Sequence, residues 1–159
     1  MKTMKTSLLF LIGAFLTVCL NAAPITHEVS VKFGPKRFLD GDSVRIDSVT
    51  STSPNLEPGD TVTVTGKYRL DSREEATLAL YLTQTEEDGI EETDPAQRVT
   101  AKRGWHEFTS VITVKHRGLL HLTFYDRTSG KPFGGVYFGT PEQIDSNHSV
   151  SIEHYPTKR

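Results

Sequence analysis

Apolar and polar residues alternate along most of the chain after residue 23, and no segment keeps the spacing of an amphipathic helix. Alternation with a period of two is typical of strands that bury one face. Gly, Pro, Asp and Ser separate the alternating segments, as expected for turns. The pattern predicts nine strands, at residues 25–33, 43–50, 61–70, 76–84, 97–102, 105–114, 118–126, 133–139 and 148–155.

So many short strands predict an all-β fold, and specifically an antiparallel β-sandwich of about eight or nine strands with a jelly-roll or immunoglobulin-like strand order. The alternation also predicts which side chains point into the core. These are Val29, Val31, Phe33, Val44, Ile46, Val62, Val64, Tyr68, Leu78, Leu80, Leu82, Phe108, Ile112, Val114, Leu120, Leu122, Phe124, Val136 and Phe138.

The same short phrase precedes two of the predicted strands, Gly41-Asp42 in one case and Gly59-Asp60 in the other. Glycine tolerates a positive φ, and aspartate accepts hydrogen bonds from nearby backbone N–H groups. We therefore interpret both phrases as tight turns and not as a structural repeat. The glycine pair Gly134-Gly135 predicts a bulge or a close backbone approach.

Residues 1–22 have the layout of a secretory signal peptide. Lys2 and Lys5 are followed by an apolar run from Leu8 to Leu20 and by the small residue Ala22. The apolar run is too short to span a hydrocarbon core of about 30 Å comfortably. The pattern predicts cleavage after Ala22 and a single domain over residues 23–159, with no transmembrane segment in the mature chain.

The sequence predicts an exported protein, periplasmic or extracellular. Cys19 is the only cysteine and lies in the predicted signal peptide, so the mature domain has no disulfide and no cysteine metal site. An exported domain without disulfides favours a bacterial source. Val18 before Cys19 is not the small residue that a lipoprotein signal requires, so the sequence does not favour lipid anchoring.

Net charge argues against a nucleic-acid partner. Residues 24–159 hold 16 basic and 20 acidic side chains, a formal charge of −4, because Lys2 and Lys5 are the only charged residues before them. Proteins that bind nucleic acid or anionic lipid are usually basic. We expect a glycan ligand or an exported protein partner instead.

No catalytic motif is present, and the chain has no phosphate-binding loop. Its histidines lack a paired spacing, and no cofactor is predicted. A calcium site at Asp40 and Asp42 is the weak alternative, because hard cations prefer several oxygen ligands on a loop.

Four aromatic residues are predicted on the outward face of neighbouring strands, together with Thr77, Thr83 and Thr123. They are Tyr81, His121, Tyr125 and Tyr137. Sugar C–H faces stack on aromatic rings and sugar hydroxyls pair with polar groups, so this face suits carbohydrate. The alternative is that Thr and Tyr are simply common on exposed sheet faces.

Trp105 is the only tryptophan and follows Gly104 at the start of a predicted strand. It is a second candidate for a binding platform. The alternative is that its ring closes the edge of the core.

Two segments resemble known modules. The phrase Pro58-Gly59-Asp60-Thr61-Val62-Thr63-Val64-Thr65-Gly66-Lys67-Tyr68 is similar to the strand entry of bacterial exported immunoglobulin-like and jelly-roll domains. The run Gly104-Trp105-His106-Glu107-Phe108-Thr109, with Thr113-Val114, resembles a late strand of jelly-roll carbohydrate-binding modules. Lys131–Thr140 departs from the aspartate-rich closing sequence of such modules, so no binding residue is transferred from them.

The predicted function is an exported, non-catalytic binding module for carbohydrate or cell-envelope glycan. The alternatives are a protein-interaction or structural module that uses a sheet edge or residues 133–138, and a hydrolase with two carboxylates facing across a groove.

Overall fold

The computed structural model describes residues 26–85, 91–93, 97–147, 150 and 155–156. The predicted signal peptide, residues 1–22, lies outside this part. In chain order the elements are β1 (His27–Glu28), β2 (Lys32–Arg37), β3 (Ser43–Ser51), β4 (Thr61–Gln84), β5 (Glu91–Thr93), β6 (Val99–Thr113), β7 (Gly118–Tyr125), β8 (Pro132–Gly139) and α1 (Pro141–Ser146). None of the described helices is both long and apolar enough to cross a membrane.

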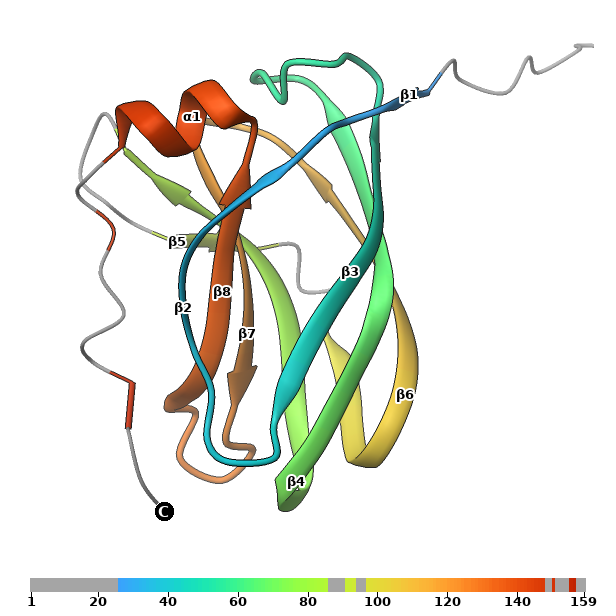
Figure 1. Cartoon of the computed structure of the whole chain (residues 1–159), viewed down its shortest axis with the longest axis vertical. Helices are drawn as coiled ribbons and strands as arrows, with labels where there is room; N and C mark the ends of the chain where they lie inside the picture. The colour runs from blue at the N-terminus through green and yellow to red at the C-terminus, as the bar shows by residue number, and fades with distance from the viewer. Residues whose placement is uncertain (1–25, 86–90, 94–96, 148–149, 151–154, 157–159) are drawn as a thin grey trace, which may run out of the picture.

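All described strand pairs are antiparallel and belong to one curled sheet (Figure 1). The strand order is β1-β3-β4-β7-β8-β2, and β5 and β6 also pair with β4. Strand β4 therefore has β3 beside its first half and β7 beside its second half, with β6 along the opposite edge. The all-β, antiparallel prediction is confirmed.

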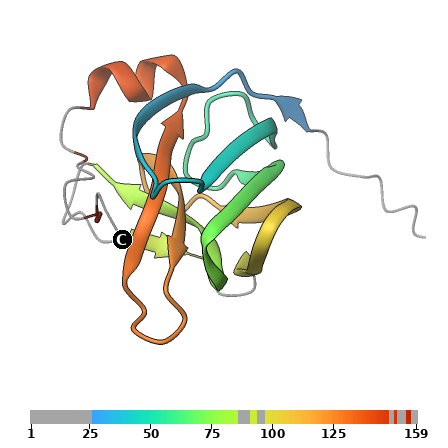
Figure 2. The same cartoon turned by 60° about the horizontal axis from the view of Figure 1, so that its bottom comes forward.

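The predicted two-sheet sandwich is not confirmed, because strands expected to end at a corner continue through it. The predicted strands 61–70 and 76–84 are one strand, β4, and the predicted strands 97–102 and 105–114 are one strand, β6. The register of the β4–β6 pair shifts between Leu70 and Glu75, and Gly104 opposite has φ = 96°. A bulge of this kind bends the sheet without breaking it, as the curved β4 and β6 ribbons of Figure 2 show.

The core lies on the concave side of the bend. Most of the predicted inward positions are buried there or packed against it, so the alternation located the core correctly. Phe33 is the exception, with 51% of its surface exposed. The predicted strand 25–33 is two short strands, β1 and β2, and Phe33 is exposed because β2 is an edge strand.

Helix α1 was not predicted, because six residues are too few to show helical periodicity. Local capping explains it. The Thr140 side chain accepts a hydrogen bond from the Gln143 N–H, and the Gln143 side chain accepts one from the Thr140 N–H. Pro141 occupies the first turn, where its missing N–H costs nothing.

The glycine pair before Val136 marks a close backbone approach, as predicted. A Cβ atom on Gly135 would lie 2.7 Å from the carbonyl oxygen of Leu122, and one on Gly134 would lie 3.1 Å from the Phe38 ring. Strand β8 is packed between β7 and β2 and is buried from Phe133 to Gly139. Residues 133–138 are thus an interior strand and not an exposed edge.

Both Gly-Asp phrases form turns, which confirms their interpretation. Gly41 has φ = 88° and Gly59 has φ = 101°. Asp42 accepts hydrogen bonds from two backbone N–H groups at the bend of β4. Asp60 accepts hydrogen bonds from the hydroxyls of Thr52 (2.9 Å) and Ser53 (2.5 Å) and from the Glu57 N–H (2.8 Å). Each aspartate therefore ties a turn to a second segment of the chain.

We predict that Asp60 makes stability depend on pH in the acid range. Burial raises its pKa, but the two hydroxyl groups and the backbone N–H outweigh this and hold the pKa below its ordinary value of 3.8. Its contribution is therefore complete above the unfolded pKa and is lost as pH falls through the folded pKa. Asp60→Asn should lower the free energy of unfolding at pH 7 by about 1–3 kcal/mol and flatten its acid dependence.

Urea unfolding between neutral pH and about pH 2 measures both effects. The control is Asp47→Asn, because the Asp47 carboxylate is exposed and forms a surface ion pair with Arg45, at 2.8 Å. Equal losses in the two variants would contradict the assigned role of Asp60.

Candidate functional site

The four aromatic residues predicted to share a face do lie together. His121 pairs with Tyr81 on one side and with Tyr137 on the other. The rings of His121 and Tyr137 are stacked, with centroids 3.8 Å apart and planes 13° apart. The rings of Tyr81 and Tyr125 are 5.3 Å apart. The alternation therefore identified a real aromatic cluster across β4, β7 and β8.

This cluster is buried. The exposed fraction is 0% for His121, 3% for Tyr137 and 8% for Tyr81, whereas Tyr125 is half-buried. Tyr155, near the end of the chain, contributes the covering ring. Its hydroxyl lies 2.6 Å from Nε2 of His121 and 3.1 Å from the hydroxyl of Thr123. In this arrangement Tyr155 packs on the face, and the central rings of the face are not available to a ligand.

We predict that the Tyr155 hydroxyl stabilises the fold. The Thr123 hydroxyl also contacts Nε2 of His121, at 2.8 Å, so the three polar groups form one buried network. Tyr155→Phe removes one member and leaves the ring in place. A buried hydrogen bond contributes about 1 kcal/mol, so the melting temperature should fall by a few degrees.

Thermal unfolding followed by circular dichroism measures this change. Thr123→Val removes a second member of the same network, and the double variant should lose less than the sum of the two single losses. Strict additivity would contradict the network.

Trp105 is the exposed aromatic candidate. Its exposed fraction is 56%, and together with Phe33 it is one of two large hydrophobic side chains exposed in the described part of the chain. It lies on β6 directly opposite Arg69 of β4, whose guanidinium carbon is 5.9 Å from the ring centroid. Arg69 is itself paired with Asp71 at 2.7 Å. The indole ring is thus an open platform beside a fixed cation.

Polar side chains continue from Trp105 along the convex face of β3, β4 and β6. Lys67 is opposite Glu107 and forms an ion pair with it, at 3.0 Å. Thr65 is opposite Thr109 and shares a hydrogen bond of 2.8 Å with Ser48 of β3. These side chains are partly or fully exposed. The surface, which we call the Trp105 face, therefore combines one aromatic ring with charged groups and rows of hydroxyls.

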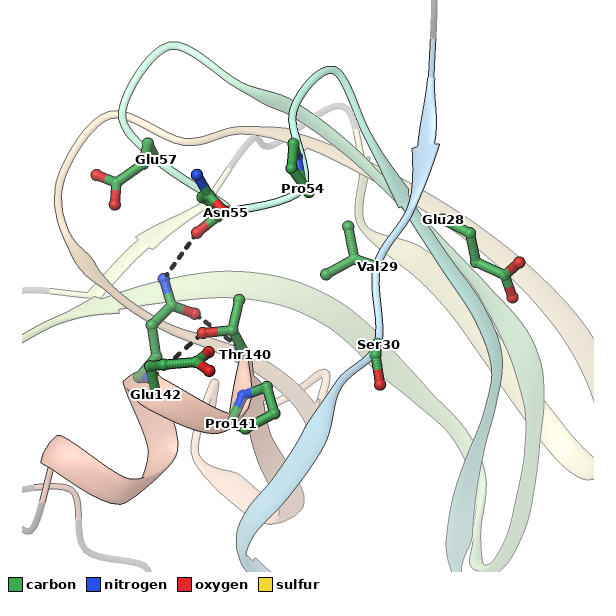
Figure 3. A pocket seen from close by; sticks show the side chains of 10 residues that line it. Glu28, Val29, Ser30, Pro54, Asn55, Glu57, Thr140, Pro141 and Glu142 are labelled. Atoms are coloured by element: carbon green, nitrogen blue, oxygen red, sulfur yellow. Dashed lines mark hydrogen bonds between the residues drawn. The ribbon is translucent and has the colours of Figure 1, made fainter.

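A separate hollow of about 470 Å³ lies between the β1–β2 segment, the loop after β3 and the start of α1 (Figure 3). Its lining contains Glu28, Glu57 and Glu142 and no basic side chain. In Figure 3 the carboxylates of Glu28 and Glu57 point away from one another. Glu57 also pairs with Arg117 at 3.4 Å, outside the hollow.

The structure places Asp40 and Asp42, the candidate calcium ligands, in the β2–β3 turn. Asp42 is buried, and its Oδ1 atom is used by the backbone N–H groups of Asp71 and Ser72. Within the described residues no three His, Cys, Asp or Glu side chains gather closely enough to hold a metal ion.

Comparison with protein-family models, with curated proteins and with solved structures found no match for this chain.

Proposed function

We propose that this protein is an exported, non-catalytic binding module for carbohydrate or cell-envelope glycan, and that the Trp105 face is its binding surface. The observation that carries the proposal is the 56% exposure of the only tryptophan, on a sheet face that is otherwise polar. An exposed indole leaves a large apolar ring face free to pack against a ligand. The rings of Tyr81, His121 and Tyr137 are not alternative binding platforms, because they are buried.

The chemistry of the face fits a sugar chain. Sugar rings present C–H groups that pack on an aromatic ring, and Trp105 offers the largest one. Their hydroxyls both donate and accept hydrogen bonds, as do the neighbouring Thr65 and Thr109 hydroxyls, while Lys67 donates and Glu107 accepts. A convex sheet face also suits an extended polymer better than a small molecule, which prefers a concave site.

We predict that Trp105→Ala reduces polysaccharide binding by about tenfold or more, which corresponds to about 1.4 kcal/mol. The loss arises because no other ring on this face replaces the indole. The test is a pull-down of residues 23–159 with a panel of insoluble polysaccharides and peptidoglycan, with and without calcium, which also tests the calcium alternative. Because Trp105 is exposed, the variant should keep the circular dichroism spectrum of the parent.

The matched control is Phe33→Ala, which removes the other exposed aromatic ring, 51% exposed on β2. This variant should bind as the parent does. Equal binding by the Trp105 variant and the parent would contradict the proposed face.

A protein-interaction module is the second candidate, and the pairing of β6 favours it. In the described part of the chain β6 pairs with β4 alone, which leaves one edge of a 15-residue strand open. Open edges can pair with a strand of another chain. A protein that retains no polysaccharide but forms a dimer, or co-purifies with another exported protein, would favour this candidate over the first.

A further inference from the structure

A second hollow, of about 490 Å³, lies where the bend of β4 meets the β7–β8 turn and the C-terminal segment. Arg73 comes from the bend, and Tyr155 and Pro156 come from the C-terminal segment. The turn contributes Asp126, Ser129 and Lys131, and the start of β8 contributes Pro132 and Phe133. None of these residues belongs to the Trp105 face, so a ligand in this hollow would be independent of the glycan proposed for that face.

Arg73 is held rigidly in this hollow. Its guanidinium carbon lies 4.4 Å from the centroid of the Phe133 ring. Phe133 is buried and stacks in turn on Phe124, with centroids 5.7 Å apart and planes 12° apart. The guanidinium therefore lies over the last ring of a stack, and the cation–π contact favours this position. Its side chain is nevertheless 37% exposed, toward the hollow.

Asp126 pairs with Arg73 but does not use all of the guanidinium donors. One oxygen of Asp126 forms an ion pair with Nη1 of Arg73, at 3.2 Å. The other oxygen accepts from the Thr128 N–H and from the N–H and hydroxyl of Ser129. Chiefly the Ser129 N–H and hydroxyl, together with the charge of Arg73, hold the pKa of Asp126 below its ordinary value. The Asp126 carboxylate is therefore ionised at neutral pH, and both of its oxygens already have partners within the protein.

The guanidinium keeps donor capacity beyond this pair. A guanidinium carries five N–H donors, and one of them is directed at Asp126. Within the described residues, Nε of Arg73 is buried without an acceptor, so the donors that a ligand in the hollow can reach are those of the Nη atoms. An anion at the exposed edge of the guanidinium would find a planar donor that is already oriented.

The rest of the lining defines what kind of anion fits. Lys131 is exposed beside Arg73, so the lining holds two cations and one anion, a formal charge of +1. Pro132, Pro156 and Tyr155 contribute apolar lining. We propose that this hollow binds a monocarboxylate attached to a ring, with the carboxylate on Arg73 and Lys131 and the ring against the two prolines. A uronic acid sugar and an aromatic carboxylate share this chemistry.

The test is a titration of the mature chain, residues 23–159, with glucuronate, benzoate and neutral glucose, followed by NMR chemical shifts. Glucuronate, benzoate or both should bind and shift the amide signals of the β7–β8 turn, whereas glucose should not. Binding of glucuronate alone would identify a site for acidic sugars. Binding of benzoate alone would identify a site for aromatic carboxylates, and binding of both would identify a site for ring carboxylates in general. Trp105→Ala should bind the carboxylate unchanged, which separates this site from the proposed glycan face.

Two variants test the residues. Arg73→Lys keeps the charge but loses the planar fork and the stack, so affinity should fall about tenfold. Lys131→Gln changes an exposed side chain, which keeps the test valid if the Arg73 variant is unstable, and should weaken binding several-fold. The matched control is Arg127→Gln, which removes one positive charge from the same turn. Arg127 pairs with Glu75 at 2.5 Å and does not line the hollow.

The proposal is overturned if the parent binds neither carboxylate, or if glucose binds as well as glucuronate. It is equally overturned if Arg127→Gln weakens binding as much as Lys131→Gln does, because the effect would then be one of net charge.

Discussion

The fold depends on the pairing of β4 with β6 on both sides of the bend of the sheet. The two strands stay paired from Thr61 with Thr113 to Leu78 with Val99, with one register shift between Leu70 and Glu75. Because the backbone hydrogen bonds continue on both sides of that shift, the two halves of the chain remain one sheet and curl around a common core. The turn at Asp42 reinforces the bend, since its carboxylate accepts from the N–H groups of Asp71 and Ser72.

This bend also decides which surfaces are available for binding. In the half formed by β7, β8 and the end of β4, both faces are buried, one by the core and the other around Tyr155. In the half formed by β3, β6 and the start of β4, the convex face stays open and presents Trp105. The hollow lined by Arg73 and Lys131 lies at the junction of the two halves. Trp105 and Arg73, the exposed groups proposed to bind ligands, therefore lie away from the buried cluster of aromatic rings around His121.

Period-two alternation predicted the all-β class, most of the core and the shared face of Tyr81, His121 and Tyr137, because each depends on which side of a strand a residue occupies. It did not predict the continuity of β4, because Asp71–Glu75 are polar and look like a turn, although pairing with β6 resumes at Glu75. Nor did it predict burial of the aromatic face, which depends on a contact with Tyr155 from a distant segment. Arg73 was missed for the same reason, since only the fold brings it to Phe133 and Asp126.

The sharpest test of the proposed binding face uses the fluorescence of Trp105, which is the only tryptophan of the chain and so reports on one position. The free domain should emit close to the maximum of the unfolded chain and be readily quenched by acrylamide. A retained polysaccharide should shift the emission to shorter wavelength and slow the quenching, because the sugar covers the indole. A short-wavelength, protected emission in the free domain, or no change when a polysaccharide binds, would contradict the assignment of this face.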